Sequence, residues 1–246
     1  MNIKNKTLWQ GALLGSALSL SSCTKQQHET NDKLNFVIIM ADDVSAVDFS
    51  CYGNKDIQTP NIDRLAQNGL QFHTCWSTPL SMPSRVQIMT GRYASSTGWY
   101  GNSFKPAGDP PYGIEGQPGY DLGEDELFFS ELFKEEGYKT AISGKWHVED
   151  YPEWETFKKD YGYDEYCLWG LPDTLPPEHK DYAKVKDASG PFWGVGDRGP
   201  FWQPAIIKNG KLGPTGEDDY GPDYFTAFVN RFIKENHKTP LWYIIQ

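Results

Sequence analysis

The sequence is poor in cysteine and in basic residues. Its 246 residues include four Cys, and no two of these have the C-x-x-C spacing. With Cys23 set aside, Cys51, Cys75 and Cys167 form an odd set, which argues against a zinc site or a disulfide framework and leaves one ordinary disulfide open. Lys and Arg number 23 against 33 Asp and Glu, which gives a formal net charge of −10. Such a chain has no general attraction for nucleic acid, so positive charge for an anionic ligand must be local or come from a metal ion.

Long apolar runs are also scarce. The run at residues 8–20 is too short to span a bilayer as a mature helix. It ends at residues 20–23 in the order Leu-Ser-Ser-Cys, which is typical of a bacterial lipoprotein cleavage box. We therefore expect a lipoprotein signal peptide at residues 1–22, acylation of Cys23, and a polar tether at residues 23–33. An ordinary secretory signal is the alternative. Both predict an exported protein, either membrane-anchored through lipid alone or free in the periplasm or outside the cell.

The pattern from residue 34 onward is typical of an α/β fold. A nearly continuous apolar run at residues 34–40 predicts a strand that is buried on both faces of a parallel sheet. Amphipathic periodicity and capping signals predict helices at residues 59–69, 124–137 and 223–236. Further strands are expected at residues 70–74, 138–143 and 241–245. This alternation predicts a mostly parallel central sheet with helices on both faces.

Aromatic residues make up 15 % of the chain and are dense in residues 150–221, which show neither helical nor strand periodicity. We interpret that region as shaped loops. Its aromatic groups at residues 161–163, 192–193 and 201–202 could stack on sugar rings, although packing within the loops is the favoured alternative.

Polar residues follow two of the predicted strands. Asp42 and Asp43 come directly after the first strand, and Lys145 and His147 follow the strand at residues 138–143. In open α/β sheets, ligands gather outside the carboxyl ends of the strands. Two adjacent carboxylates repel each other there unless a cation or protons intervene, and a hard divalent metal ion is the simplest solution. The alternative is that one of the two Asp caps a turn.

The segment Ser81-Met82-Pro83-Ser84-Arg85 predicts the first turn of a helix with a hydroxyl at its entrance. Backbone N–H groups and the helix dipole favour an anion at such an entrance, and Arg85 would lie on the same side one turn further on. A capped helix with one surface Arg is the alternative.

Together these segments resemble the formylglycine-dependent sulfatases, of the arylsulfatase type within the alkaline phosphatase superfamily. Four signatures carry the resemblance. They are Asn-Phe-Val-Ile-Ile-Met-Ala-Asp-Asp at residues 35–43, Thr-Pro-Asn-Ile-Asp-Arg-Leu-Ala at residues 59–66, the motif at residues 81–91, and Gly-Lys-Trp-His at residues 144–147. Their order and spacing match the family along the mature chain, and the motif at residues 81–91 is the most specific.

The resemblance implies that a maturase oxidises Ser81 to formylglycine, whose hydrated aldehyde is the nucleophile. One hydroxyl of the gem-diol attacks sulfur as the alcohol departs. The second hydroxyl allows the sulfated intermediate to collapse, which releases sulfate and regenerates the aldehyde. Because the residue is Ser and not Cys, the family pattern points to a radical maturase that works without oxygen.

The resemblance also implies one calcium ion and a role for each charged residue. The metal ligands would be Asp42, Asp43 and the modified Ser81. Arg85 would fix the gem-diol, Lys145 would contact the sulfate and the nucleophile, and His147 would assist the collapse. The expected substrate is a sulfated small molecule or glycan.

One departure from the family concerns the end of the sequence. Family members carry a catalytic His, an Asp-Asn or Asp-His pair that completes the metal shell, and a Lys near the leaving group after a strand like residues 241–245, whereas this sequence stops at Gln246. We therefore expect residues 34–246 to form the N-terminal portion of a sulfatase catalytic domain. Two alternatives stay open. One is an inactive sulfatase-like lipoprotein fragment, and the other is a phosphate-ester hydrolase of the same superfamily with an unmodified Ser and a two-metal site.

Overall fold

The protein is described here by a computed structural model. It describes residues 33–101, 126–148, 156–170, 201–202, 204–213, 215–216 and 218–245. The predicted signal peptide, Cys23, nearly all of the tether and the aromatic pair at residues 192–193 lie outside these residues.

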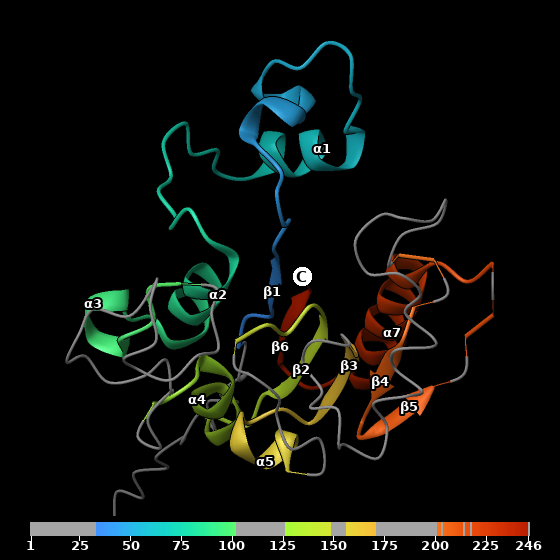
Figure 1. The fold of residues 1–246 in the computed structure, drawn as a ribbon. Helices are drawn as coiled ribbons and strands as arrows, with labels where there is room; N and C mark the ends of the chain where they lie inside the picture. Colours follow the sequence, from blue (N-terminus) through green and yellow to red (C-terminus); the bar gives the residue numbers. More distant parts are fainter. Residues whose placement is uncertain are drawn as a thin grey trace, which may run out of the picture. The chain divides into compact units, whose positions relative to one another are not determined.

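A six-stranded sheet in the order β1-β6-β2-β3-β4-β5 is the centre of the fold (Figure 1). Its strands are β1 (Phe36–Ile39), β2 (Lys139–Gly144), β3 (Glu165–Trp169), β4 (Ile206–Lys208), β5 (Lys211–Gly213) and β6 (Leu241–Ile245). The α-helices are α1 (Pro60–Asn68), α2 (Ser81–Thr90), α3 (Ala94–Thr97), α4 (Phe129–Glu135), α5 (Phe157–Asp160) and α7 (Gly221–Asn236), and two short 3-10 helices are η1 (Ala46–Asp48) and η2 (Ser50–Tyr52).

The four strands from β1 to β3 are parallel, as the sequence predicts. The strand β6 lies between β1 and β2, so that Trp242 is the register partner of Phe36 on one side and Thr140 on the other. The strands β4 and β5 continue the sheet as an antiparallel hairpin. Its turn is Asn209-Gly210, with both residues at positive φ, which is the combination that tight hairpins favour.

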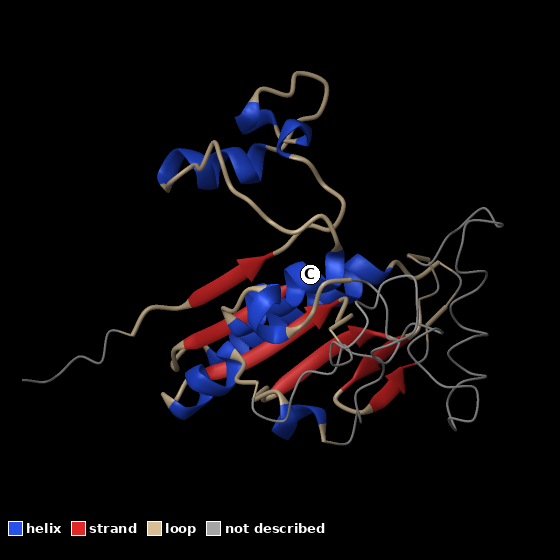
Figure 2. Cartoon of the chain, turned by 60° about the vertical axis from the view of Figure 1, so that its left-hand side comes forward, coloured by secondary structure: helices blue, strands red, loops and turns tan. Residues whose placement is uncertain are grey.

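Helices cover both faces of the sheet (Figure 2). Alternate residues of each strand point to opposite faces, so neighbouring residues join two separate cores. On β6, Trp242 and Ile244 pack into the core that includes residues of α2, whereas Leu241 and Tyr243 pack into the core of α7. The prediction of helices on both faces is confirmed.

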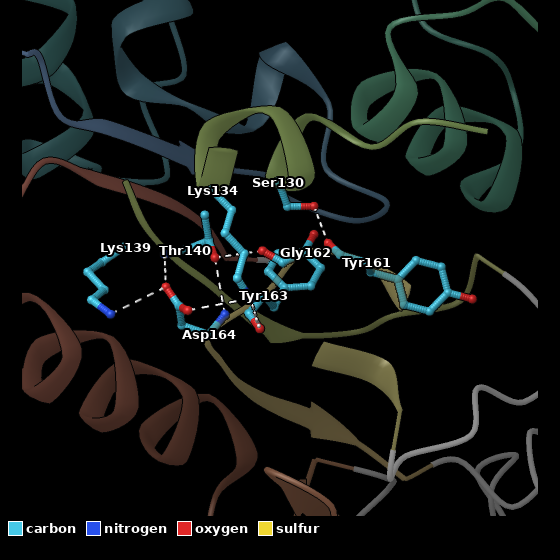
Figure 3. Close-up of polar contacts among 8 residues, drawn as sticks. All are labelled: Ser130, Lys134, Lys139, Thr140, Tyr161, Gly162, Tyr163 and Asp164. Carbon is cyan, nitrogen blue, oxygen red and sulfur yellow. Dashed lines mark hydrogen bonds and ion pairs between the residues drawn. The ribbon is translucent and has the colours of Figure 1, made fainter. Parts of the chain in front are cut away.

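A polar network fixes the register of β2 and β3 at their amino ends (Figure 3). The Thr140 hydroxyl donates to the Gly162 carbonyl at 2.7 Å and accepts from the Asp164 N–H at 3.1 Å. The Asp164 carboxylate in turn accepts from the Thr140 N–H at 3.1 Å and lies 3.9 Å from Lys139 Nζ. These contacts lie at the edge of the sheet opposite the strand ends that carry the predicted site.

The strand β1 corrects one prediction. Instead of being buried on both faces, it lies at the edge of the sheet, and Val37 and Ile39 are 49 % and 65 % exposed. Two features of the described residues explain this exposure: β1 pairs with β6 alone, and the core on the α7 face includes no residue of β1, whereas Ile38 packs against the core on the other face.

Other predictions fared unevenly. The helices expected at residues 59–69 and 223–236 are confirmed as α1 and α7. Residues 70–74 form no strand, and the helix expected from residue 124 begins at Phe129. The region expected to be loop contains α5, β3, β4 and β5.

Cys51, Cys75 and Cys167 are free thiols. No helix in the described part of the chain is long and apolar enough to cross a membrane.

We expect the free edge of β1 to make the chain self-associate, because an exposed apolar edge strand offers unpaired backbone groups to another chain. Val37→Lys places a charge on this edge and should shift the chain towards monomer in sedimentation velocity over a concentration series. The matched control is Val47→Lys, because Val47 is also exposed, at 68 %, but belongs to η1 and not to a strand. Wild-type chain that stays monomeric at high concentration would contradict this expectation.

Candidate active site

Ser81 is the first residue of α2, as expected. Leu80 precedes it with extended backbone as the N-cap residue. Asp42 follows β1 and lies at the carboxyl edge of the sheet. Arg85 lies in α2, one turn after Ser81. The Ser81 hydroxyl accepts a hydrogen bond from Arg85 Nε at 3.0 Å.

Arg85 is a buried cation, and its donors reach three separate segments. Its residue exposure is 2 %. Besides Ser81, Nη1 donates to the backbone carbonyl of Lys145 at 3.0 Å, and Nη2 lies 3.2 Å from Asp42 Oδ2. Burial lowers the pKa of Arg85 while Asp42 opposes that shift, and a guanidinium stays charged in proteins. The alternative of a surface Arg is therefore wrong.

Asp42 joins the two cations of the site. Its Oδ2 atom accepts from Lys145 Nζ at 2.7 Å and also faces Arg85, so one oxygen serves both. Partial burial raises the pKa of Asp42, but the hydrogen bond and charge of Lys145, with a contribution from Arg85, outweigh that effect and lower the pKa overall. Asp42 is thus ionised at neutral pH. Its Oδ1 atom has no hydrogen-bond partner in the part of the chain that the structure describes.

His147 follows the end of β2 and is kept neutral at neutral pH. Burial, together with the positive charges of Lys145 and Arg85, lowers the pKa of its imidazole to about 4. Its backbone lies at φ 48°, and Asp43 lies at φ 55°. Left-handed backbone costs non-Gly residues roughly 1 to 3 kcal/mol and is found most often at functional sites.

A cavity of about 740 Å³ opens between the end of β1 and the entrance of α2. Its lining includes Asp42, Asp43, Ser81 and Arg85. The Asp43 carboxylate makes no hydrogen bond or ion pair to any described residue. An anion in this cavity would therefore meet the Ser81 hydroxyl and the Arg85 guanidinium on one wall, with the two carboxylates beside them.

The oxygen atoms in this cavity are of the type that a hard cation prefers as ligands. Asp42 Oδ1, the Asp43 carboxylate and the Ser81 hydroxyl are oxygen donors, which calcium prefers. Six to eight oxygens are its usual number, so these residues supply part of a shell. The described residues contain no group of three or more His, Cys, Asp or Glu side chains that could hold a metal ion.

Comparison with known proteins supports one family. The family model described as Sulfatase matches residues 34–243. The chain belongs to the sulfatase family. An N-acetylglucosamine-6-O-sulfatase of Bacteroides thetaiotaomicron is 36 % identical over 224 residues, which cover 91 % of this chain and 31 % of that protein. An N-acetylgalactosamine-6-sulfatase of Canis lupus familiaris is 32 % identical over 191 residues, which cover 73 % of this chain and 34 % of that protein.

A solved structure has a similar fold. The crystal structure of Ps i-CgsB in complex with k-i-k-neocarrahexaose matches with a TM-score of 0.60 and 30 % identity, over 87 % of this chain and 44 % of that one. The chain therefore spans about a third of the length of these two curated relatives and less than half of this structure.

The structure brings together the residues that the sequence singles out. Asp42, Ser81, Arg85 and Lys145 are linked by direct contacts, Asp43 lines the same cavity, and the charges of Lys145, Arg85 and Asp42 all act on His147. Two features went unpredicted, the Lys145 backbone carbonyl that accepts from Arg85 and the hydroxyl cluster formed by Ser77, Thr78 and Ser84. A backbone carbonyl carries no sequence signal, whereas four hydroxyl residues within residues 77–84, around a helix start, are a signal that was available.

We predict that Asp42→Asn destabilises the fold at neutral pH by about 1 to 2 kcal/mol, because Arg85 loses the charge that compensates its burial while Asp42 itself is partly exposed. The pKa of Asp42 is lowered in the folded state, so its stabilisation is present above the unfolded pKa of about 3.9 and is lost as pH falls through the lower folded pKa. The difference between wild type and variant should therefore narrow as pH falls below about 4 and close once pH is below the folded pKa of Asp42.

Urea unfolding at pH 7 and pH 3 measures this difference. Asp43→Asn is the matched control, since it removes the neighbouring carboxylate, which has no described partner, and should leave the free energy of unfolding nearly unchanged. Equal effects of the two substitutions at pH 7 would show that the contact between Asp42 and Arg85 contributes nothing specific.

Proposed function

We propose that this chain is the nucleophile-bearing part of a sulfuric ester hydrolase, with Ser81 oxidised to formylglycine. The observation that carries the proposal is the placement of Ser81 at a helix entrance, with Arg85 Nε 3.0 Å from its hydroxyl and Lys145 joined to the same cluster through Asp42. Donors aimed at the place where negative charge develops are what sulfuryl transfer needs.

In this proposal each residue has one task. The hydrated aldehyde at position 81 presents one hydroxyl to sulfur, and Arg85 holds that group by the hydrogen bond it now gives to Ser81. Lys145, which now donates to Asp42, would face the sulfate oxygens once Asp42 binds a metal ion instead. His147, neutral because its pKa is about 4, accepts the proton of the second hydroxyl as sulfate leaves and the aldehyde is regenerated.

We further propose that Asp42 and Asp43 hold one calcium ion beside position 81. When bound, the ion would supply positive charge for the sulfate oxygens. The charge balance of the site supports this, since the two cations Arg85 and Lys145 are offset by the two carboxylates. Without a metal ion the cluster would be neutral overall, and an anionic ester would gain little electrostatic attraction from it. Further oxygens would have to come from water, substrate or residues outside those described.

We propose a sulfated sugar as the substrate. The Bacteroides and Canis relatives are named for sulfatase activity on N-acetylhexosamine 6-sulfates, and Ps i-CgsB was solved with an oligosaccharide. A human steryl-sulfatase is also similar, at 43 % identity over 46 % of this chain, so a sterol sulfate is the competing substrate.

Two partners of the chain are proposed from sequence alone. A maturase would oxidise Ser81, and a lipid on Cys23 would anchor the exported protein to a membrane. The supporting signals are the Ser-x-Pro-x-Arg pattern from residue 81 and the Leu-Ser-Ser-Cys order at residues 20–23.

Hydrolysis of an aryl sulfate by chain produced together with a maturase tests the activity. We expect turnover with calcium, none after chelation, none for Ser81→Ala, and a loss of about 100-fold for Lys145→Ala, the usual effect of removing one donor to developing charge. Lys139→Ala is the matched control, because Lys139 begins the same strand at the opposite edge and should not affect the rate. Absence of Ser81-dependent turnover would favour the inactive-fragment alternative, and cleavage of an aryl phosphate instead would favour the phosphatase.

A further inference from the structure

The entrance of α2 is held by a group of hydroxyls that does not include Ser81. No side chain caps the helix at its N-cap residue, Leu80. Instead Ser84, one turn into the helix, points back to the preceding loop. Its Oγ atom lies 2.6 Å from Thr78 Oγ1 and 2.8 Å from Ser77 Oγ. We call Ser77, Thr78 and Ser84 the hydroxyl clasp.

Backbone carbonyls complete the hydroxyl clasp. Ser84 Oγ is also 2.9 Å from the Leu80 carbonyl and 3.1 Å from the Thr78 carbonyl, and Thr78 Oγ1 donates to the same Leu80 carbonyl at 3.0 Å. A hydrogen bond from a helical Ser to the carbonyl four residues earlier is common by itself. The contacts to Thr78 and Ser77 differ, because they join the helix to residues outside it.

Ser81 has a different task from the hydroxyl clasp. Its hydroxyl accepts from Arg85 Nε, and it lines the cavity of about 740 Å³. A Ser that capped the helix would have its side-chain oxygen occupied as an acceptor for backbone N–H groups, so that oxygen would be less available to a substrate. Here the helix entrance has its own hydrogen bonds, so the side chain at position 81 is free for chemistry.

We infer that the hydroxyl clasp fixes the entrance of α2 independently of residue 81, and that Ser84 is a positioning residue for the group at that position. Its value to catalysis rests on the proposed function, in which residue 81 changes from a hydroxyl to an aldehyde. The structural claim stands on the contacts of Ser84 alone and can be tested without turnover.

Hydrogen exchange of the α2 amides, followed by mass spectrometry on the unmodified full chain, tests the claim. We expect Ser84→Ala and Thr78→Val each to speed exchange of the amide of residue 84, which donates to the Leu80 carbonyl at 3.3 Å, and of the helical amides that follow it, roughly 5- to 10-fold, the equivalent of losing about one hydrogen bond. The double variant should speed exchange by less than the product of the two single effects, because Ser84 and Thr78 share the contact between their hydroxyls. Ser84→Thr keeps the hydroxyl and should restore slow exchange.

Two controls make the outcome decisive. Ser81→Ala should change the same amides less than about 3-fold, and Ser96→Ala in α3 should not change them. Slow exchange in α7 shows that a variant has not simply unfolded. Unchanged exchange in Ser84→Ala, or equal acceleration by Ser81→Ala, would overturn the inference.

A second readout concerns position rather than stability. In chain made with a maturase, methoxyamine should react with the aldehyde at position 81 at least 3-fold faster in Ser84→Ala than in wild type or Ser84→Thr. An equal rate in all three would contradict a positioning role. If no aldehyde forms in the wild-type chain, the proposed function fails. The exchange experiment still decides whether Ser84 holds the helix entrance.

Discussion

The site depends on one buried cation, Arg85. A buried guanidinium costs several kcal/mol unless its donors are paired. Its partners are the Ser81 hydroxyl, the Lys145 carbonyl and the Asp42 carboxylate, which come from a helix entrance and from the ends of two parallel strands. Arg85 can be buried only when these three segments meet. The geometry of the site is therefore a condition of folding at this edge of the sheet, and not a later addition to a finished scaffold.

The three partners of Arg85 differ in how freely they can change. The Lys145 carbonyl belongs to the backbone, and Asp42 supplies the compensating charge, so replacing either removes part of the support. Ser81 contributes only a hydroxyl oxygen to Arg85 Nε, and a hydrated aldehyde would present an oxygen at the same place. With the hydroxyl clasp holding the helix entrance, residue 81 is the one partner whose chemistry can change while the fold stays intact.

Much of this arrangement was predictable from local patterns. The helix α2, the parallel strands β2 and β6, and the meeting of Asp42 with Arg85 follow from strand and helix signals and from the rule that ligands gather at the carboxyl edge. The exposure of β1 was not predictable, because an apolar run looks the same whether or not a neighbouring strand is present. The strands β3 to β5 were missed because they are three to five residues long and lie among aromatic residues, although Asn209-Gly210 was a hairpin signal that could have found two of them.

The central claim is that position 81 carries a modified nucleophile. Mass spectrometry of the peptide that contains Ser81, from full chain produced in a host that supplies the maturase, tests it most directly. The predicted result is the loss of two hydrogens at Ser81, with retention of the unmodified mass in an Arg85→Ala variant if Arg85 belongs to the maturation signal. Intact Ser81 in the wild-type chain, from a host shown to modify another sulfatase, would contradict the claim.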